Sequence, residues 1–229
     1  MLLLVALCLV MYVVLYYAVM IETGVINVIK LKGLDISHHN KNIRQLKVLN
    51  NYDFIIMKAT EGSTYADPAM STYMNYLNSD MLKGFYHFAR PENKNKPEAE
   101  ASNFLSHVLK YLDGRCILAL DVEAGALNVK DLDEWCLKWC QYVYAATGIK
   151  PLIYCSEAEC YRFKKTAAFG CGLWVAKWGV SKPKKITPWK FYAIWQKSDK
   201  HLVSGVKCDL NYFNGDETQY IKYCRPEMR

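Results

Sequence analysis

From residue 31 onward, short apolar runs alternate with segments whose apolar residues recur at helical spacing. The eight runs that we predict to be strands cover 31–37, 52–60, 83–89, 116–123, 151–156, 172–178, 191–198 and 207–213. Strand–helix alternation predicts a parallel sheet with right-handed crossovers, and eight such strands predict a closed α/β barrel. The last three strands are separated by loops too short for ordinary helices, so we expect the outer ring of helices to be incomplete.

The helices between the first five strands have recognisable starts and stops. The segment 40–50 carries a short apolar face, Asp67-Pro68 supplies a cap and a first-turn proline, and Pro97 begins a longer helix. A fourth helix is predicted from 131 to 146, ended by Gly148, and a short helical piece from 157 to 163.

One strand ends in two acids, in the sequence Ile-Leu-Ala-Leu-Asp-Val-Glu at 117–123. Residues two apart on a strand point to the same side, so Asp121 and Glu123 should project together, about 6.5–7 Å apart along the chain. Two carboxylates that share a site push one pKa upward, which gives one proton donor and one anion. Hydrolysis of a glycosidic bond needs one carboxyl group that donates a proton and one that stays ionised. The alternative is a strand end at which two carboxylates simply meet water.

Other polar side chains also follow the predicted strands. They are Asp35, Glu61, His87, Arg90, Tyr154, Lys177, Trp178, Gln196 and Asp209. In a parallel barrel the carboxyl ends of all strands open onto one face, where active sites are built. The sequence therefore predicts a site at that face, with acids and aromatics from several strands.

Six motifs in order carry a resemblance to a known family. They are DISHHN (35–40), KATEGSTYADP (58–68), GFYHFAR (84–90), LDVE (120–123), WQ (195–196) and CDLN (208–211). Together they resemble glycoside hydrolase family 25, the N-acetylmuramidases or ch-type lysozymes. The resemblance spans about 31–213 and implies a TIM-like (β/α)5(β)3 barrel. It also implies cleavage of the β-1,4 bond between N-acetylmuramic acid and N-acetylglucosamine in peptidoglycan.

The resemblance also assigns roles to four acids. Glu123 matches the general acid, which protonates the glycosidic oxygen and must be neutral beforehand. Asp121 would stay charged and hold the 2-acetamido group of the substrate, stabilise the cation or act as nucleophile; these alternatives stay open. Asp35 and Asp209, on the first and last strands, would stabilise charge and orient the pair, unless one of them merely pairs with Lys58 or Arg90.

Substrate contacts are expected from Tyr154, Trp178 and Gln196, with core packing as the alternative. His87 is a possible substrate contact, although a lone histidine at a strand end is more often a structural hydrogen bonder. No metal-ligand spacing is visible, so we expect catalysis without metal or cofactor. The competing function is a barrel that grips glycan without cutting it.

The N-terminal segment 2–21 contains no charged residue and is long enough to cross a bilayer as a helix. We therefore expect a transmembrane or signal-anchor segment at 1–22, a linker at 23–30, the barrel at 31–215 and a tail at 216–229. Lys30 and Lys32 favour a cytoplasmic body by the positive-inside rule. The expected function instead requires a barrel that faces the cell envelope or the extracellular side, either membrane-anchored or secreted.

The formal charge of +7 favours anionic partners, but the basic residues look scattered and match no nucleic-acid motif. We expect peptidoglycan strands and the membrane as partners, no nucleic acid, and a monomeric barrel. Eight cysteines follow the apolar segment. They are either disulfide-bonded, with Cys155, Cys160 and Cys171 as the best candidates, or buried free thiols.

Overall fold

A computed structural model describes residues 11–12 and 30–225 of the chain. The chain divides into two compact units, 1–30 and 31–229, which are considered separately. Of the first unit the described residues are Met11 and Tyr12, which are helical, and Lys30. Within the described ranges no helix combines the length and apolarity that a membrane crossing needs. The expected anchor at 2–21 lies, apart from Met11 and Tyr12, outside the described residues.

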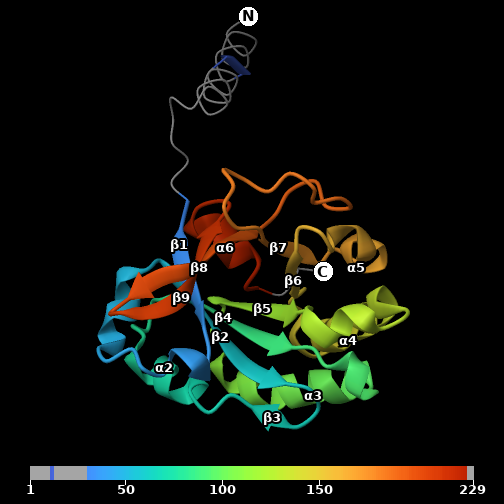
Figure 1. Ribbon diagram of the computed structural model, residues 1–229, viewed down its shortest axis with the longest axis horizontal. Coiled ribbons are helices and arrows are strands. Elements are labelled where there is room, and N and C mark those ends of the chain that lie inside the picture. Colours follow the sequence, from blue (N-terminus) through green and yellow to red (C-terminus); the bar gives the residue numbers. More distant parts are fainter. Residues whose placement is uncertain (1–10, 13–29, 226–229) are drawn as a thin grey trace, which may run out of the picture. The chain divides into compact units, whose positions relative to one another are not determined.

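The second unit is a closed barrel of eight strands (Figure 1). The ring order is β1-β2-β4-β5-β6-β7-β8-β9, and β9 returns to β1. The strands are β1 Lys32–Ile36, β2 Phe54–Glu61, β4 Leu82–Phe88, β5 Cys116–Asp121, β6 Leu152–Ser156, β7 Gly172–Ala176, β8 Ile194–Val203 and β9 Val206–Phe213. A two-residue strand, β3 Tyr65–Ala66, pairs with β2 outside the ring. The eight predicted strands and the TIM-like fold are confirmed.

Helices surround the first five strands, as the alternation predicted. The α-helices are α2 Met70–Tyr76, α3 Pro97–Val108, α4 Leu132–Thr147, α5 Lys164–Ala168 and α6 Glu217–Lys222. The short 3-10 turns are η1 His38–Asn40, η2 Leu46–Asn51, η3 Pro91–Asn93, η4 Leu109–Tyr111, η5 Ala124–Asn128 and η6 Cys160–Arg162. The segment 40–50, expected as one helix, is therefore helical only from Leu46 onward, where η2 begins, and residues 41–45 form turns and irregular structure.

Strand alternation separates two apolar cores. Ile117 and Ala119 of β5 belong to the cluster inside the barrel, with Phe54 and Trp174. Leu118 and Leu120 belong to the larger cluster between the barrel and its helices. Every residue of β5 is buried. Because the strand is buried on both faces, residues 117–120 form an unbroken apolar run. Asp121 follows this run as the last residue of the strand.

The barrel is closed by one antiparallel strand. β8 and β9 form a hairpin with a turn at Ser204-Gly205, where both residues have positive φ. β9 then pairs antiparallel with β1, which places Asp35 opposite Asp209. Closure therefore brings the first and last catalytic candidates together, although 174 positions separate them in the sequence.

The segment after residue 215, expected as a tail, includes a helix that packs on the barrel. Asp216 and Gln219 form a capping box at the start of α6. Tyr220 is fully buried, contacts the ring of Phe54 at a centroid distance of 5.4 Å, and donates a hydrogen bond to the carbonyl of Lys83 at 2.9 Å. Because Lys83 lies at the start of β4, α6 covers the amino ends of the parallel strands (Figure 1).

The eight cysteines of the described part are all unpaired and buried. The sulfurs of Cys155 and Cys160 are 3.8 Å apart, well beyond an S–S bond of about 2.05 Å. The structure therefore corresponds to the second alternative, in which these thiols pack as small apolar groups.

Candidate active site

A cleft of about 440 Å³ lies at the carboxyl ends of the parallel strands. Seven of the eight predicted site residues line it, namely Asp35, Asp121, Glu123, Tyr154, Trp178, Gln196 and Asp209. The lining also includes residues that were not predicted, namely Ser37, His39, Asn40, Lys58, Tyr86, Phe88, Trp174, Asp199 and Lys207. The barrel thus gathers the acids of four strands or strand ends in one cavity.

Asp121 and Glu123 follow from how β5 ends. Asp121 is the last residue of the strand, and its carbonyl accepts a hydrogen bond from Ala89 at 3.0 Å. Glu123 keeps an extended backbone, and Ala124 then turns the chain with a positive φ of 50°. Both side chains therefore enter the cleft from the same strand end. Asp121 is buried, and its Oδ1 has no hydrogen-bond partner among the described residues.

Asp35 is held by two amides. Asn211 donates to its Oδ2 at 2.6 Å and Gln196 donates to the same oxygen at 3.0 Å. The orientation of the Asn211 amide is set in turn by Trp174, whose indole N–H donates to Asn211 Oδ1 at 2.8 Å. Asp35 also shares a hydrogen bond with Asp209, its cross-strand partner. The pair is therefore fixed before any substrate enters.

The carboxyl groups in the cleft have raised pKa values. Burial is the main cause for Asp35, Asp121 and Glu123, and the neighbouring acids add to the rise for Asp121 and Glu123. Burial, followed by Asp35, raises the pKa of Asp209 to about 8. Asp121 was expected to stay charged, but its pKa is raised well above the usual value because it is more deeply buried than Glu123. These shifts favour the protonated forms of the carboxyl groups in the cleft.

The nearby cations do not pair with the catalytic candidates. Lys58 Nζ lies 2.5 Å from Glu61, and Arg90 Nε lies 2.6 Å from the other oxygen of Glu61. Arg90 also contacts Glu92 at 3.2 Å. The alternative in which Asp35 or Asp209 pairs with Lys58 or Arg90 is therefore wrong, and Glu61 instead fixes these two cations beside the cleft.

Gln196 connects one wall of the cleft to its floor. Its Oε1 accepts hydrogen bonds from Tyr154 at 3.0 Å and from the indole N–H of Trp178 at 3.2 Å, while its Nε2 donates to Asp35. Tyr154 is buried and packs edge-on against Trp174, whereas Trp178 is half exposed. Trp178 therefore presents an aromatic face at the rim, and Gln196 holds it in place.

The family is decided by sequence comparison. The pattern of Glycosyl hydrolases family 25 matches residues 34–206, which is most of the chain. The chain belongs to this family. It is therefore a glycoside hydrolase, which favours an enzyme over a barrel that only binds glycan.

Individual family 25 relatives agree with this assignment. Lysozyme M1 of Streptomyces globisporus is 31% identical over 207 residues, covering 83% of this chain and 70% of that protein. A family GH25 lysozyme from Aspergillus fumigatus has a solved structure that is 31% identical, with a TM-score of 0.73, covering 86% of this chain and 99% of that one. The solved structure of a bacterial lysozyme from Streptomyces coelicolor is 28% identical, with a TM-score of 0.74. The match covers 85% of this chain and 96% of that one.

His87 is the one predicted site residue that the family 25 barrel keeps out of the cleft. It is fully buried and stacks on Trp139, with ring centroids 5.5 Å apart. Its Nδ1 lies 2.7 Å from the hydroxyl of Thr60 and its Nε2 lies 2.8 Å from Glu100. The possible substrate contact is therefore wrong, since His87 points into the layer between barrel and helices as a structural hydrogen bonder.

Removing the partner of His87 should destabilise the fold. Glu100 is fully buried on α3 and also accepts from the backbone N–H of Arg90 at 3.1 Å. Glu100→Ala should lower the free energy of unfolding by roughly 3 kcal/mol, because it leaves these buried donors unpaired. Urea denaturation would measure this change. Glu98→Ala, at an exposed position in the first turn of the same helix, is the matched control, and an equal loss in both variants would contradict the prediction.

Asn211 is the functional residue that sequence reasoning missed most clearly. It lies two residues after Asp209 on β9, so strand periodicity already placed both side chains on one face. Lys58 and Tyr86 were also missed, although both occupy inward positions near strand ends. No group of acids, histidines or cysteines within the described ranges is arranged to hold a metal ion.

The raised pKa of Asp209 predicts a pH dependence of stability. In the folded chain Asp209 keeps its proton up to about pH 8, whereas its ordinary pKa is 3.8. The folded state binds more protons than the unfolded state between these values, so the free energy of unfolding falls as pH rises through that window. Asp209→Asn should therefore raise Tm at pH 8 and change it little at pH 4. Asp80→Asn, at an exposed position, is the control, and an equal shift at both pH values would contradict the argument.

Proposed function

We propose that the protein is a lysozyme that hydrolyses the β-1,4 bond between N-acetylmuramic acid and N-acetylglucosamine in peptidoglycan. Glu123 is the general acid and Asp121 assists. The observation that carries the proposal is the pair of acids at the end of β5, in a family 25 cleft, with raised pKa values. A raised pKa favours the protonated carboxyl group, which can donate its proton to the leaving oxygen.

Glu123 and Asp121 have different roles in the reaction because their environments differ. Glu123 is half-buried and lies nearer the open side of the cleft, where a glycosidic oxygen can reach it. Asp121 lies deeper, and its Oδ1 is buried without a hydrogen-bond partner among the described residues. Positive charge that develops at the anomeric carbon would favour the ionised form of Asp121. Asp121 then holds the 2-acetamido group, stabilises the cation or attacks it as a nucleophile.

Asp35 and Asp209 support this pair from the opposite side of the barrel. Their shared hydrogen bond and the amides of Asn211 and Gln196 hold them rigidly. Once the pair has released a proton, the shared negative charge stabilises the positive charge of the transition state, which is the usual electrostatic contribution of a preorganised site. Trp178 at the rim and Tyr154 beneath it offer a stacking face and a hydroxyl to the sugar rings.

The choice of peptidoglycan as substrate is supported by the relatives. Besides Lysozyme M1, an N,O-diacetylmuramidase of Arthroderma benhamiae is 26% identical over 209 residues, covering 85% of this chain and 87% of that protein. We further propose that the barrel acts on the envelope or extracellular side, where this polymer lies. The segment 2–21 would either anchor it in the membrane or direct its secretion.

The test is incubation of the full chain with purified peptidoglycan and identification of the new reducing ends by mass spectrometry. Fragments that end in reducing N-acetylmuramic acid are expected. Fragments that end in reducing N-acetylglucosamine would support the same active site but show that the enzyme cleaves the other glycosidic bond. A folded wild type that binds peptidoglycan and releases no reducing ends from walls of several types would overturn the proposal.

A further inference from the structure

The positive charge of the chain is concentrated in one segment. Residues 177–209 contain eight lysines and only two acids, Asp199 and Asp209, which gives a formal charge of +6. The whole chain carries +7, so the remaining residues are almost neutral. The basic residues are therefore not scattered, since the surplus of positive charge lies in the single connection from β7 to β9.

This segment forms one wall of the active-site cleft. Trp178, Gln196 and Lys207 line the cleft, and so do the two acids of the segment, Asp199 and Asp209. The catalytic acids Asp121 and Glu123 come from β5 and its end, outside this segment. The segment contributes one lysine, Lys207, to the cleft itself, and three of its other lysines line a neighbouring hollow.

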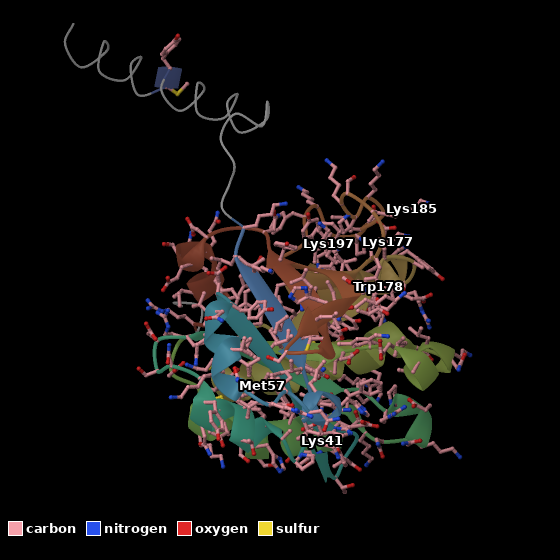
Figure 2. The ribbon with its side chains drawn as sticks, turned by 60° about the vertical axis from the view of Figure 1, so that its left-hand side comes forward. Lys41, Met57, Lys177, Trp178, Lys185 and Lys197 are labelled. Atoms are coloured by element: carbon pink, nitrogen blue, oxygen red, sulfur yellow. The ribbon has the colours of Figure 1, made fainter. Side chains whose placement is uncertain are left out.

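A second hollow of about 570 Å³ lies next to this wall, and lysines surround it. Lys177, Lys184 and Lys185 line it together with Tyr161, whose ring is exposed. Lys177 and Trp178 are consecutive residues after β7, so one lines the hollow and the next lines the cleft. Figure 2 shows Lys177, Lys185 and Lys197 in the same part of the molecule as Trp178. The hollow therefore borders the cleft at its tryptophan rim.

The loop that carries these lysines is fixed by one partly buried acid, Glu157, which also lines the hollow. Glu157 accepts hydrogen bonds from the backbone N–H groups of Lys184 and Lys185 at 2.5 and 3.1 Å. Its other oxygen lies 3.2 Å from Lys177 Nζ. The side chains of Lys184 and Lys185 are exposed and have no ion-pair partner within residues 30–225. The backbone is thus held in place while two ammonium groups stay available to a ligand.

We propose that this hollow is a subsite for the carboxylates of the stem peptide that N-acetylmuramic acid carries in peptidoglycan. The inference rests on the proposed function and extends it from the glycan bond to the peptide. A peptide attached to the sugar at the cleaved bond lies within reach of a hollow that borders the cleft. Lysine ammonium groups attract carboxylates, and the face of Tyr161 provides apolar contact for peptide side chains.

The test compares binding of two soluble glycans, prepared from walls freed of phosphate polymers, to the full chain carrying Glu123→Gln. One glycan keeps its stem peptides and the other has lost them to an amidase. The peptide-bearing glycan should bind about 3- to 10-fold more tightly at low salt, because two exposed charge pairs contribute modestly. The preference should shrink at high salt, which screens exposed charges.

Lys184→Gln with Lys185→Gln, added to the same background, should abolish the preference without changing the affinity for the peptide-free glycan. The matched control is Lys110→Gln with Lys222→Gln, two exposed lysines near the opposite end of the barrel, which should keep the preference. Equal binding of both glycans, or a preference that survives loss of Lys184 and Lys185, would overturn the proposal. So would a lysine-dependent preference that appears only when phosphate polymers are left on the wall.

A parallel measurement with Glu123 intact separates this inference from the proposed function. The double lysine variant should raise KM on the peptide-bearing glycan about 3- to 10-fold and leave kcat unchanged. If the wild type cleaves both glycans equally well, the peptide subsite fails while the lysozyme stands. If it cleaves neither, the proposed function fails, and the binding experiment still decides whether the lysines recognise the peptide.

Discussion

Glu123→Gln should reduce kcat on peptidoglycan by roughly 10²- to 10⁴-fold, the contribution of a positioned general acid. Glutamine has nearly the same shape but cannot donate a proton to the leaving oxygen. The affinity for glycan should change little, because Glu123 is half-buried at the end of β5 and no other described side chain depends on it for a hydrogen bond. Reducing-end release per unit time measures kcat, and glycan binding by calorimetry measures the affinity.

The leaving group provides the decisive control for Glu123. An aryl glycoside of N-acetylmuramic acid with a strongly acidic phenol leaves without protonation, so Glu123→Gln should recover most of its rate on that substrate. The alkaline limb of the pH–rate profile, which reports loss of the proton from the acid, should also disappear in the variant. A variant that is equally slow on both substrates would show that Glu123 has another role.

Asp121→Asn should reduce kcat by roughly 10²- to 10³-fold, as removal of one preorganised electrostatic group does in other enzymes. Asp121 is buried in the cleft and has an unpartnered oxygen, so it is placed to act on the reacting sugar and not to hold the fold. The pKa of Glu123 should change little in the variant, because burial and Asp35 raise it, so the alkaline limb should keep its position. The pH–rate profile of the variant measures both effects.

Asp35→Asn is the comparison for Asp121. Asp35 accepts hydrogen bonds from Asn211 and Gln196 and is expected to orient the site, so its loss should cost less rate than the loss of Asp121. Equal losses in the two variants would contradict the separation of their roles. Asp121→Ala with added azide tests the nucleophile alternative, because azide can replace a lost nucleophile and leave a glycosyl azide. Formation of that product would favour covalent catalysis or its acetamido equivalent over simple charge stabilisation.

Local patterns in the sequence were sufficient to predict the framework. The run at 117–120 is apolar throughout because β5 is buried on both faces, and Asp121 and Glu123 follow it at a spacing of two. These patterns depend on residues close together in the chain, so periodicity alone locates them. The same reasoning predicted the eight strands and the carboxyl-end site.

The sequence patterns did not predict in which direction side chains point near the strand ends. Asp121 is the last residue of β5 and His87 the second-last residue of β4, yet His87 points outward to Glu100 and Trp139 while Asp121 points into the cleft. The irregular register between β2 and β4 near Lys58 and Thr60 changes which residues face inward there. A shift of one residue reverses the face of a side chain, and a sequence pattern does not locate such shifts.

By itself, then, the sequence determined the order of strands and helices, the family and the identity of the acids, because these are encoded in local spacing and motifs. Only the tertiary structure decided which distant residues meet. Closure of β9 on β1 places Asn211 and Asp209 beside Asp35, and α6 covers the amino ends of the strands. The same folding places Trp178 and Lys207 in the lining of the cleft, and Lys177, Lys184 and Lys185 around the second hollow. The physical reason is that contacts between residues far apart in the chain arise only when the barrel closes and buries its apolar surface.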